Sequence, residues 1–409
     1  MISLEDHLRR CLDAVAPLEP LELALLEAQD CVLAEDVVSP LDLPGFDNSA
    51  MDGYAVTEAD VAAASEQSPV RLPVVADVPA GATHQARIVP GQAVRIMTGA
   101  PLPAGAEAVV PVEDSDGGIR EVELRASVPA GRHVRRAGTD VKAGDLVLAA
   151  GAQLGPAQLA LLAAVGRSRV RVHPRPRVVV LSTGSELVEP GRTPGFGQVV
   201  DSNGIMLTAA AIDAGARPYR VGVVRDEPQE FLRTLTDQLV RADLVVTSGG
   251  VSAGAYDTVK EVLSGLGTVW FGKVAMQPGM PQGFGTVGED HTPIFTLPGN
   301  PVSSFVSFEM FVRPVLRKMA GHQGLFRRSE TARALEPWSA PSGKVQLARG
   351  ELGTTDDGER VVRLAGPSQG SYVLGGLAAA TCLVVVPEHV TRVEAGDELR
   401  CLVLDRRRR

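Results

Sequence analysis

Apolar residues in the second half of the chain alternate between short continuous runs and runs at helical spacing. The continuous runs, which are typical of buried strands, lie at 177–181, 219–224, 244–246, 269–271 and 293–296. The segments with helical spacing begin near 205 and then cover 230–240, 258–263 and 302–319. This alternation predicts a parallel or mixed, doubly wound α/β domain over residues 173–326.

The first half of the chain has shorter apolar runs separated by Pro and Gly turn signals. These runs lie at 72–75, 93–97, 108–112 and 121–124. They predict a small β domain, residues 51–140, inserted into an elongated N-terminal domain. The elongated domain then comprises residues 1–50 and 141–172.

The remaining segments carry weaker patterns. Residues 6–27 have apolar positions at helical spacing that Pro17 and Pro20 interrupt, so we expect two short helices, or a helix and a turn. Residues 154–165 predict one more helix. Short Val and Leu runs with Pro and Gly return from 327 to 409, which predicts a C-terminal, barrel-like β domain.

Composition and charge narrow the class of protein. Aromatic residues make up 4% of the 409 residues, so the cores must be built from Val, Leu and Ala. The formal charge of -9 has the wrong sign for a protein that grips nucleic-acid phosphates. No apolar run approaches the ~20 residues of a membrane helix, and the first residues lack the core of a signal peptide. We therefore expect a cytoplasmic protein with no nucleic-acid or membrane partner.

Polar, glycine-rich loops follow several predicted strands. In open α/β sheets such loops meet at the carboxyl ends of the strands and surround the ligand. One loop contains Ser248, Gly249, Gly250 and Ser252, and its glycines let backbone amides approach a phosphate or a pterin. An ordinary tight turn between strand and helix explains the same residues. A second loop, typical of a rigid turn that feeds a helix, consists of Pro298, Gly299, Asn300, Pro301 and Ser303.

Three carboxylates, Glu186, Asp226 and Asp257, also follow predicted strands or the glycine loop. If the strands are parallel, these groups share one edge of the sheet and together suit Mg²⁺, which prefers carboxylate oxygens, water and substrate phosphates. A single carboxylate at such a position is more often a helix cap or a dipole partner, and the three together favour the functional interpretation. The four cysteines form no C-x-x-C pair and the seven histidines are dispersed, so we expect no zinc or iron–sulfur site.

Loops in the first half offer further candidates. Residues 45–54 mix Phe46, Met51 and Tyr54 with Asp and Asn, a combination typical of an ordered loop at a binding surface. A chain of Asx turns packed under its own aromatic residues is the alternative. Asp140 is another exposed carboxylate, for which the residues alone favour a plain turn.

Five motifs follow one another along the chain: 47–55 (DNSAMDGYA), 95–100 (RIMTGA), 182–186 (STGSE), 248–252 (SGGVS) and 297–301 (LPGNP). In this order they resemble the molybdopterin molybdenumtransferase family, which includes bacterial MoeA and the E domain of gephyrin. The resemblance covers nearly the whole chain. It implies four domains and a homodimer with a shared active site, in which Asp52, Thr98 and Asp140 reach across to the partner's α/β domain.

The resemblance also implies that adenylylated molybdopterin and molybdate are the substrates, that molybdenum cofactor and AMP are the products, and that Mg²⁺ or a similar divalent ion assists. The implied catalytic residues, of which the last three also serve the metal, are Asp52, Asp140, Glu186, Asp226 and Asp257. The implied substrate-binding residues are Thr98, Thr183, Gly184, Ser248, Gly249, Gly250, Ser252, Lys273, Pro298, Gly299, Asn300, Pro301, Ser303, Arg349 and Ser371. Within this set, Arg349 and Ser371 help bind the oxyanion. The expected partners are molybdopterin adenylyltransferase and molybdoenzymes.

Gln277 and Met280 depart from the family, which commonly has Lys-Pro-Gly-Lys-Pro where this chain has Gln-Pro-Gly-Met-Pro. Two ammonium groups are therefore missing, and Lys273, Arg349 and Lys344 remain. We expect weaker affinity for molybdate, or a paralogue with an altered oxyanion preference.

Two other kinds of function stay open. One is a catalytically weak paralogue or a scaffold of the same family, because the related domain of gephyrin also anchors receptors. The other is a molybdopterin adenylyltransferase or a CinA-like nucleotide hydrolase, because these share the Ser-Gly-Gly sheet. The inserted β domain with its 47–55 loop favours the molybdenumtransferase over the second kind.

Overall fold

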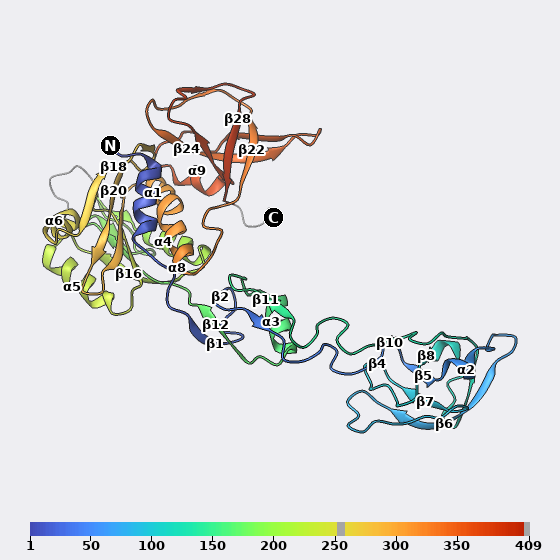
Figure 1. The fold of residues 1–409 in the computed structure, drawn as a ribbon. Helices are drawn as coiled ribbons and strands as arrows, with labels where there is room; N and C mark the ends of the chain where they lie inside the picture. The colour runs from blue at the N-terminus through green and yellow to red at the C-terminus, as the bar shows by residue number, and fades with distance from the viewer. Residues whose placement is uncertain (252–257, 405–409) are drawn as a thin grey trace. The chain divides into compact units, whose positions relative to one another are not determined.

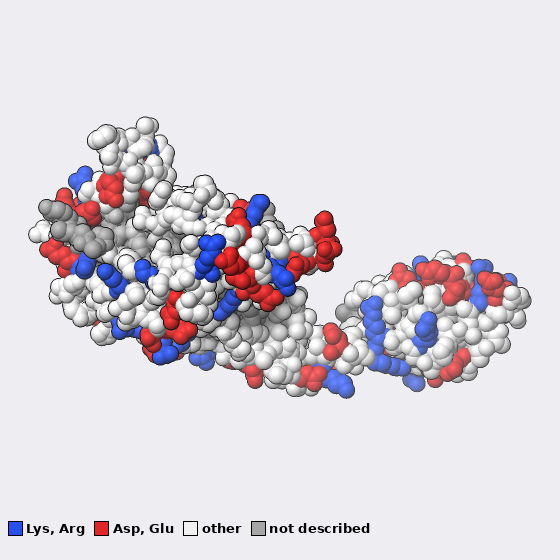
Figure 2. Space-filling model, turned by 90° about the horizontal axis from the view of Figure 1, so that it is seen from above, with Lys and Arg blue, Asp and Glu red and all other residues white. Residues whose placement is uncertain are grey.

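The computed structural model describes residues 1–251 and 258–404, so Ser252 and Asp257 lie outside the described part (Figure 1). The chain forms two compact units. The first comprises Met1–Glu22, Asp30–Ala34 and Arg171–Arg409, and the second comprises Leu23–Gln29 and Glu35–Val170. Within the described residues, no helix is long and apolar enough to cross a membrane. Acidic and basic side chains are interspersed on the face that Figure 2 shows.

A mixed six-stranded sheet lies at the centre of the first unit, as the alternating patterns predict. In spatial order its strands are β16 (Arg217–Val224), β13 (Arg177–Thr183), β17 (Leu244–Ser248), β21 (Thr292–Leu297), β20 (Pro281–Val287) and β18 (Val269–Lys273). The first four are parallel, and β20 is antiparallel to both of its neighbours.

Helices cover both faces of this sheet. One layer contains α4 (Asn203–Asp213), α7 (Pro301–Ser307) and α8 (Arg313–Met319), and the opposite layer contains α5 (Pro228–Leu239) and α6 (Thr258–Gly265). Successive strand residues point to opposite faces, so Val178 and Val180 pack in the first layer while Val179 packs in the second. Burial on both faces is the reason that these strands are continuous apolar runs.

The strand β20 is absent from the prediction, because its Pro-Gln-Gly-Phe-Gly sequence has the composition of a loop. In the sheet these glycines are required by close packing. A Cβ atom on Gly285 would lie 2.2 Å from the carbonyl oxygen of Thr268, and one on Gly283 would lie 2.7 Å from the ring of Phe271. Tertiary packing therefore makes a strand of a segment with weak intrinsic preference.

The N-terminal segment forms one helix, α1 (Leu4–Asp13), which begins after Ser3, whose hydroxyl accepts the backbone N–H of Asp6. The next regular element is the strand β1 (Leu21–Ala24), so the expectation of a second helix is wrong. Over a run as short as Leu-Glu-Leu-Ala, strand alternation and helical spacing give nearly the same apolar positions.

His7 on α1 is fully buried beside the rings of Trp270 and Phe311. Burial lowers the pKa of His7 to about 4, and the charge of Arg10 adds to this effect. The unfolded chain therefore binds a proton between the ordinary pKa of 6.5 and about 4, where the folded chain does not. We expect His7 to remove about 2 kcal/mol of stability as the pH falls from 7 to 5. Denaturant unfolding at pH 7 and pH 5 measures this loss. In His7→Leu the free energy of unfolding should depend less on pH than in the wild type, whereas the exposed control His84→Leu should keep the wild-type dependence. The same pH dependence in His7→Leu as in the wild type would contradict this assignment.

The C-terminal part of the first unit is a closed five-stranded barrel, which confirms the predicted barrel-like β domain. Around the ring its strands are β24 (Val345–Thr354), β25 (Arg360–Leu364), β22 (Ser329–Ala334), β28 (Glu398–Val403) and β26 (Cys382–Val386), and β26 pairs back with β24. The short strand β19 (Met276–Gln277), which follows β18, pairs with the start of β24. This pairing connects the barrel with the segment that precedes β20.

The long helix predicted over 302–319 contains one π-helical turn (Phe308–Val312) between α7 and α8. The backbone N–H of Arg313 bonds to the carbonyl oxygen of Phe308, five residues earlier. The next residue, Pro314, has no N–H to donate, which accounts for the wider turn.

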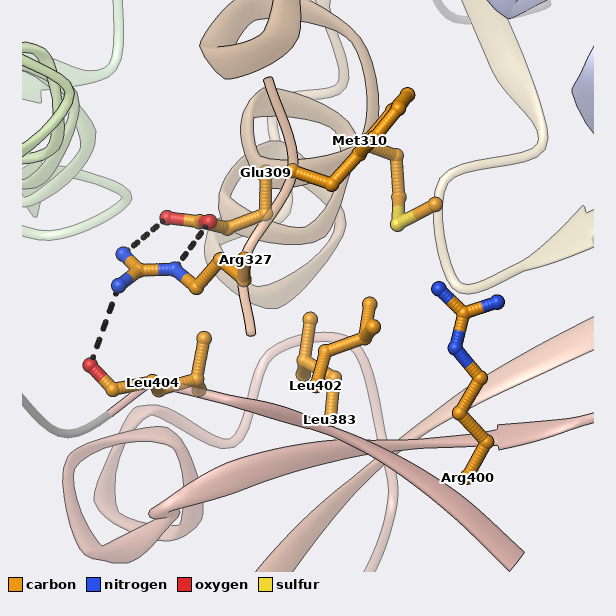
Figure 3. A pocket seen from close by; sticks show the side chains of 8 residues that line it. Glu309, Met310, Arg327, Leu383, Arg400, Leu402 and Leu404 are labelled. Atoms are coloured by element: carbon orange, nitrogen blue, oxygen red, sulfur yellow. Dashed lines mark hydrogen bonds and ion pairs between the residues drawn. The ribbon is translucent and has the colours of Figure 1, made fainter. Parts of the chain in front are cut away.

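The π turn carries Glu309, which belongs to a largely buried network of four charges. Its carboxylate accepts hydrogen bonds from Arg327 at 2.6 and 2.8 Å (Figure 3). Asp213 lies 2.7 Å from Arg327 and 2.8 Å from Arg313. A pocket of about 40 Å³ lies beside Glu309 and Arg327 and is lined mainly by apolar residues such as Met310 (Figure 3). Two positive and two negative groups compensate one another here.

The second unit contains a five-stranded sheet. Its strands in order are β8 (Ala108–Pro111), β5 (Gly53–Val56), β7 (Ala93–Ile96), β6 (Val70–Val78) and β9 (Glu121–Leu124). Four of them correspond to the predicted apolar runs, whereas β5 corrects the expectation of a loop up to Tyr54. Tyr54 is fully buried in the sheet and its hydroxyl donates to the carbonyl oxygen of Gly118 at 2.9 Å, while Phe46 stays exposed.

The helix predicted over 154–165 forms as α3 (Pro156–Ala164). Shorter elements before residue 174 are β2 (Val32–Leu33), β3 (Val37–Val38), β4 (Asn48–Ser49), α2 (Glu58–Val61), a 3-10 turn (Val112–Asp114), β10 (Val134–Arg135), β11 (Leu146–Leu148) and β12 (Arg169–His173). Shorter elements after it are β14 (Leu187–Val188), β15 (Val199–Val200), β23 (Trp338–Ser339), α9 (Leu374–Ala379) and β27 (Arg392–Val393).

Candidate functional site

A pocket of about 690 Å³ lies at the carboxyl ends of β13, β17 and β21, where the sequence predicts a ligand site. We call it the strand-end pocket. Predicted residues that line it are Thr183, Glu186, Ser248, Gly249, Gly299, Asn300 and Pro301. Apolar side chains of Leu187, Val199, Val200 and Leu374 also line it, so the pocket offers both polar groups and apolar surface.

The 248–250 turn requires glycine at positions 249 and 250, because of its backbone conformation and its close packing. Gly249 and Gly250 have φ values of +94° and +90°, which favour glycine. A Cβ atom on Gly249 would lie 2.9 Å from the carbonyl oxygen of Thr183, and one on Gly250 would lie 2.4 Å from Cβ of Val259. The hydroxyl of Thr183 donates to the carbonyl oxygen of Ser248 at 3.3 Å. Two strand ends are thereby joined beneath the pocket.

Asn203, in the first turn of α4, connects two loops of the strand-end pocket and is absent from the predicted site. Its Nδ2 donates to the hydroxyl oxygen of Ser248 and to the carbonyl oxygen of Gly299, each at 2.7 Å. The side chain is 9% exposed and lines the pocket. In the sequence its only signal is the Asp-Ser-Asn run at the start of α4, which is typical of a helix cap and gives no hint of this bridge.

A buried carboxylate, Asp201, lies beside Asn203 and is held by opposite charge. Its oxygens accept the backbone N–H of Gly204 at 2.9 Å and the guanidinium of Arg220 at 2.8 Å. Burial tends to lower the pKa of Arg220, but hydrogen bonds from Arg220 to Asp201 and Glu189 outweigh burial and hold that pKa above its usual range. The wall of the pocket near α4 is therefore a paired, rigid structure.

The carboxylates predicted to serve a metal lie at the same strand ends as far as they are described. Asp226 accepts the backbone N–H of Ser185 at 3.0 Å, and its own carbonyl oxygen accepts the hydroxyl of Thr258 at 3.0 Å. The carboxylate of Glu186 lies over Gly184, where an added Cβ atom would meet it at 2.7 Å. Asp257 and Ser252 fall outside the described residues.

Among residues 1–251 and 258–404, no three His, Cys, Asp or Glu side chains come together as a metal site. The donors offered by Glu186 and Asp226 are carboxylate oxygens, which fit Mg²⁺ because this ion keeps several waters and takes only one or two protein carboxylates beside substrate phosphates. The described residues are thus compatible with the ion implied by the sequence.

A second pocket, of about 300 Å³, lies under the loop between β19 and β20, and we call it the Gln277 pocket. Its lining includes the predicted residues Ser303 and Ser371 together with Gln277, Met280 and Lys344. Lys344 is the one cationic residue among the described residues that line it. Lys273 lies at the end of β18, is exposed, and lines neither pocket. Hydroxyls, the carboxamides of Gln277 and Gln369 and one ammonium group suit a small oxyanion.

Arg349 does not line either pocket. It is 1% exposed, and its guanidinium donates to the carbonyl oxygens of Ser368 and Val373. Gln369 accepts the backbone N–H of Arg349 at 2.8 Å. Burial lowers the pKa of Arg349. In this arrangement the arginine fixes the loop that carries Ser371.

The first turn of α7 separates the two pockets. Pro301 lines the strand-end pocket and Ser303 lines the Gln277 pocket. Between them, the backbone N–H of Val302 donates to the carbonyl oxygen of Ser371 at 3.0 Å, which ties the barrel loop to this helix start. The two pockets are therefore neighbours on either side of one helix start.

Three predicted residues belong to the second unit. Asp52 accepts the backbone N–H of Thr98 at 2.6 Å and its hydroxyl at 2.8 Å, and these bonds hold the pKa of the Asp52 carboxyl below its usual range. Asp140 is exposed and its backbone N–H donates to the carbonyl oxygen of Leu43 at 2.9 Å. The structure thus pairs Asp52 with Thr98.

Comparisons with known proteins cover almost the whole chain. Residues 2–166 match the MoeA N-terminal region (domain I and II), residues 179–318 match the probable molybdopterin binding domain, and residues 331–404 match the MoeA C-terminal region (domain IV). Molybdopterin molybdenumtransferase 2 of Mycobacterium tuberculosis strain H37Rv is 47% identical over 98% of this chain and 99% of its own length. Molybdopterin molybdenumtransferase 1 of that strain is 44% identical over 97% of each chain.

Solved structures agree with these matches. The molybdopterin biosynthesis MoeA protein from Pyrococcus horikoshii superimposes with TM-scores of 0.81 and 0.77 in two crystal structures, at 31% and 29% identity. The first covers 99% of this chain and 99% of the solved chain. The second covers 98% and 100%.

Proposed function

This chain belongs to the molybdopterin molybdenumtransferase (MoeA) family, and from that premise we propose that it inserts molybdate into adenylylated molybdopterin and releases AMP. One observation carries the proposal: two pockets of different size and polarity flank the first turn of α7. The larger one suits the nucleotide and the pterin, and the smaller one suits molybdate.

The strand-end pocket, at about 690 Å³, has the size of typical sites for cofactor-sized ligands. Its glycine turn at 248–250 brings backbone close to the ligand, and Ser248 and Asn300 add polar groups. Leu187 and Leu374 offer apolar surface to the flat rings of the pterin or the adenine. These features support binding of the adenylylated substrate there.

Glu186 and Asp226, with Asp257, are the proposed holders of a divalent ion such as Mg²⁺. When bound, such an ion neutralises part of the charge of a pyrophosphate group. The chain's own residues fix the geometry: Ser185 N–H and Thr258 hydroxyl hold the side chain and backbone of Asp226 in place. An Asp226 carboxylate held in this way needs little rearrangement when substrate arrives.

The Gln277 pocket is the proposed site of molybdate, held by the hydroxyls of Ser303 and Ser371 and by Lys344. Arg349 supports this site through the loop that carries Ser371. Asp52, Thr98 and Asp140 act in the proposal as contributions from a second copy in a homodimer. The protein is proposed to work in the cytoplasm, next to molybdopterin adenylyltransferase and the recipient molybdoenzymes.

The proposed division into domains is 1–50 with 141–172, 51–140, 173–326 and 327–409. The α/β sheet has a buried core of its own on the face that α5 and α6 cover, and the barrel has another, which supports the last two of these ranges. The sheet of β5 to β9 supports the inserted domain in the same way.

Gln277 and Met280 make the molybdate pocket less positive than the common family pattern. The double variant Gln277→Lys/Met280→Lys should lower the molybdate concentration for half-maximal turnover about ten-fold, because charge-assisted bonds are roughly 1 to 1.5 kcal/mol stronger than neutral ones. Steady-state turnover at varied molybdate measures the shift. Gln238→Lys on α5, which lines neither pocket, is the matched control. An unchanged half-saturation value in the double variant would contradict the assignment of this pocket.

Transfer of the product to a recipient tests the proposed function as a whole. Purified protein, adenylylated molybdopterin, Mg²⁺ and molybdate are incubated together and then added to an apo-molybdoenzyme. The proposal predicts activation of that enzyme only when all components are present. Activation that is independent of this protein at low molybdate would contradict the proposal.

A further inference from the structure

A buried carboxamide lies beneath the Gln277 pocket. Gln282, on β20, is 1% exposed although glutamine is among the residues found mostly at protein surfaces. Its Nε2 donates to the carbonyl oxygen of Gly279 and to the hydroxyl oxygen of Ser307, each at 2.6 Å. Because Gly279 offers a carbonyl oxygen, the NH₂ group and not Oε1 must face it, and this fixes the orientation of the amide.

The two hydrogen bonds join the pocket loop to the helix α7. Gly279 has a φ of +93°, and a Cβ atom there would lie 2.7 Å from the Ser307 hydroxyl, so the loop is packed directly on the helix. The same loop carries Gln277 and Met280, which line the pocket. At the far end of the loop, the backbone N–H of Val274 donates to the carbonyl oxygen of Met280 at 2.8 Å. The 274–280 loop is thus held at its two ends by the Val274–Met280 bond and at Gly279 by Gln282.

We infer that Gln282 is a positioning residue that sets the affinity of the Gln277 pocket for its oxyanion, an inference that rests on the proposed function of that pocket. Gln282 does not line the pocket itself and acts through the loop. The helix α7 supplies Ser303 to the other side of the pocket, one turn before Ser307. The amide therefore sets the spacing between Gln277 and Met280 on the loop and Ser303 on the helix.

Asn203 has the same chemistry in the strand-end pocket, where its NH₂ group joins Ser248 and Gly299. Each pocket is consequently held by one buried carboxamide. The two residues provide matched controls for each other, because an amide-to-acid change in either one removes a pair of donated hydrogen bonds without a large change in volume. A change at one of these two residues should therefore leave the affinity of the other pocket for its ligand unchanged.

The experiment measures half-saturation for molybdate and for adenylylated molybdopterin in the full-length protein. Wild type is compared with Gln282→Glu, Asn203→Asp and the milder Ser307→Ala, and thermal unfolding verifies that each variant is folded. We expect Gln282→Glu to raise the half-saturation concentration of molybdate about ten-fold and to leave that of adenylylated molybdopterin within about two-fold of the wild type. Ser307→Ala should shift the same value about three-fold, since it removes one of the two hydrogen bonds. Asn203→Asp should instead raise the half-saturation concentration of adenylylated molybdopterin and leave that of molybdate within about two-fold.

Equal shifts of both substrates in Gln282→Glu and in Ser307→Ala would overturn the inference, as would no shift in either. Ser307→Ala keeps the test decisive if Gln282→Glu does not fold. Molybdate-dependent AMP release by the wild type is measured first, because its absence contradicts the proposed function. An active wild type with unshifted variants contradicts only the role of Gln282. Gln238→Leu on α5, which loses a glutamine that lines neither pocket, should keep both half-saturation values of the wild type.

Discussion

Replacing Asp226 with alanine should lower AMP release about 100-fold or more and leave the protein folded, since removal of one preorganised electrostatic group commonly costs two to three orders of magnitude in rate. Asp226 lies at the carboxyl end of β16 and accepts the backbone N–H of Ser185 beside Glu186. The variant therefore loses a negative group at the proposed metal position. Initial rates of AMP release at saturating substrates measure the effect.

Two further variants separate charge from structure at this position. Asp226→Asn keeps an oxygen that can accept the Ser185 N–H but removes the charge, so it should be nearly as inactive as Asp226→Ala. The neighbouring Glu227 is exposed and makes no side-chain cap bond for α5, so Glu227→Ala should keep wild-type activity. Full activity in Asp226→Asn would instead mean that Asp226 only shapes the 182–186 loop.

Glu309→Ala should destabilise the first unit by about 3 to 5 kcal/mol, because it leaves Asp213 as the one carboxylate of the network to compensate the guanidinium groups of Arg313 and Arg327. Glu309 is 6% exposed and contacts Arg327 through both of its oxygens. Burial tends to lower the pKa of Arg327, yet hydrogen bonds and charge from Glu309 and Asp213 outweigh burial and hold that pKa above its usual range. The arginine therefore stays charged and depends on this carboxylate.

Tryptophan fluorescence in denaturant measures this loss in the first unit, because both tryptophans of the chain, Trp270 and Trp338, belong to it. The control is Glu394→Ala, which breaks an ion pair with Arg392 in which both side chains are 59% exposed. It should change stability by less than about 1 kcal/mol. Similar losses for the two variants would show that the buried network contributes no more than a surface pair.

The α/β sheet could be predicted because its parallel strands are buried on both faces and are therefore continuous apolar runs. The runs at 177–181 and 244–246 fall inside β13 and β17. The strands β20 and β5 could not be predicted, because their own residues do not form a strand pattern. In β20 the glycines are required by the close approach of neighbouring backbone and rings, which the sequence does not show. The strand β5 follows a polar loop directly, so its apolar residues look like part of that loop.

The loops of the candidate site could also be predicted, since ligands of open α/β sheets bind at the carboxyl ends of the strands, where these glycine, proline and acidic residues lie. The residues that position those loops could not. Asn203 and Gln282 look like ordinary polar residues in the sequence, and only their burial and their hydrogen bonds show that they join separate segments. Arg349 was expected to touch the oxyanion, whereas its described contacts are with backbone carbonyl groups.

The most direct test of the proposed function follows AMP in a mixture of the purified protein, adenylylated molybdopterin and Mg²⁺. Molybdate is added at increasing concentration, with sulfate as the control oxyanion. The two adjacent pockets predict that AMP appears in proportion to adenylylated molybdopterin and only after molybdate is added. Binding of adenylylated molybdopterin without molybdate-dependent release of AMP would contradict the proposal and favour a non-catalytic binding protein of the same family.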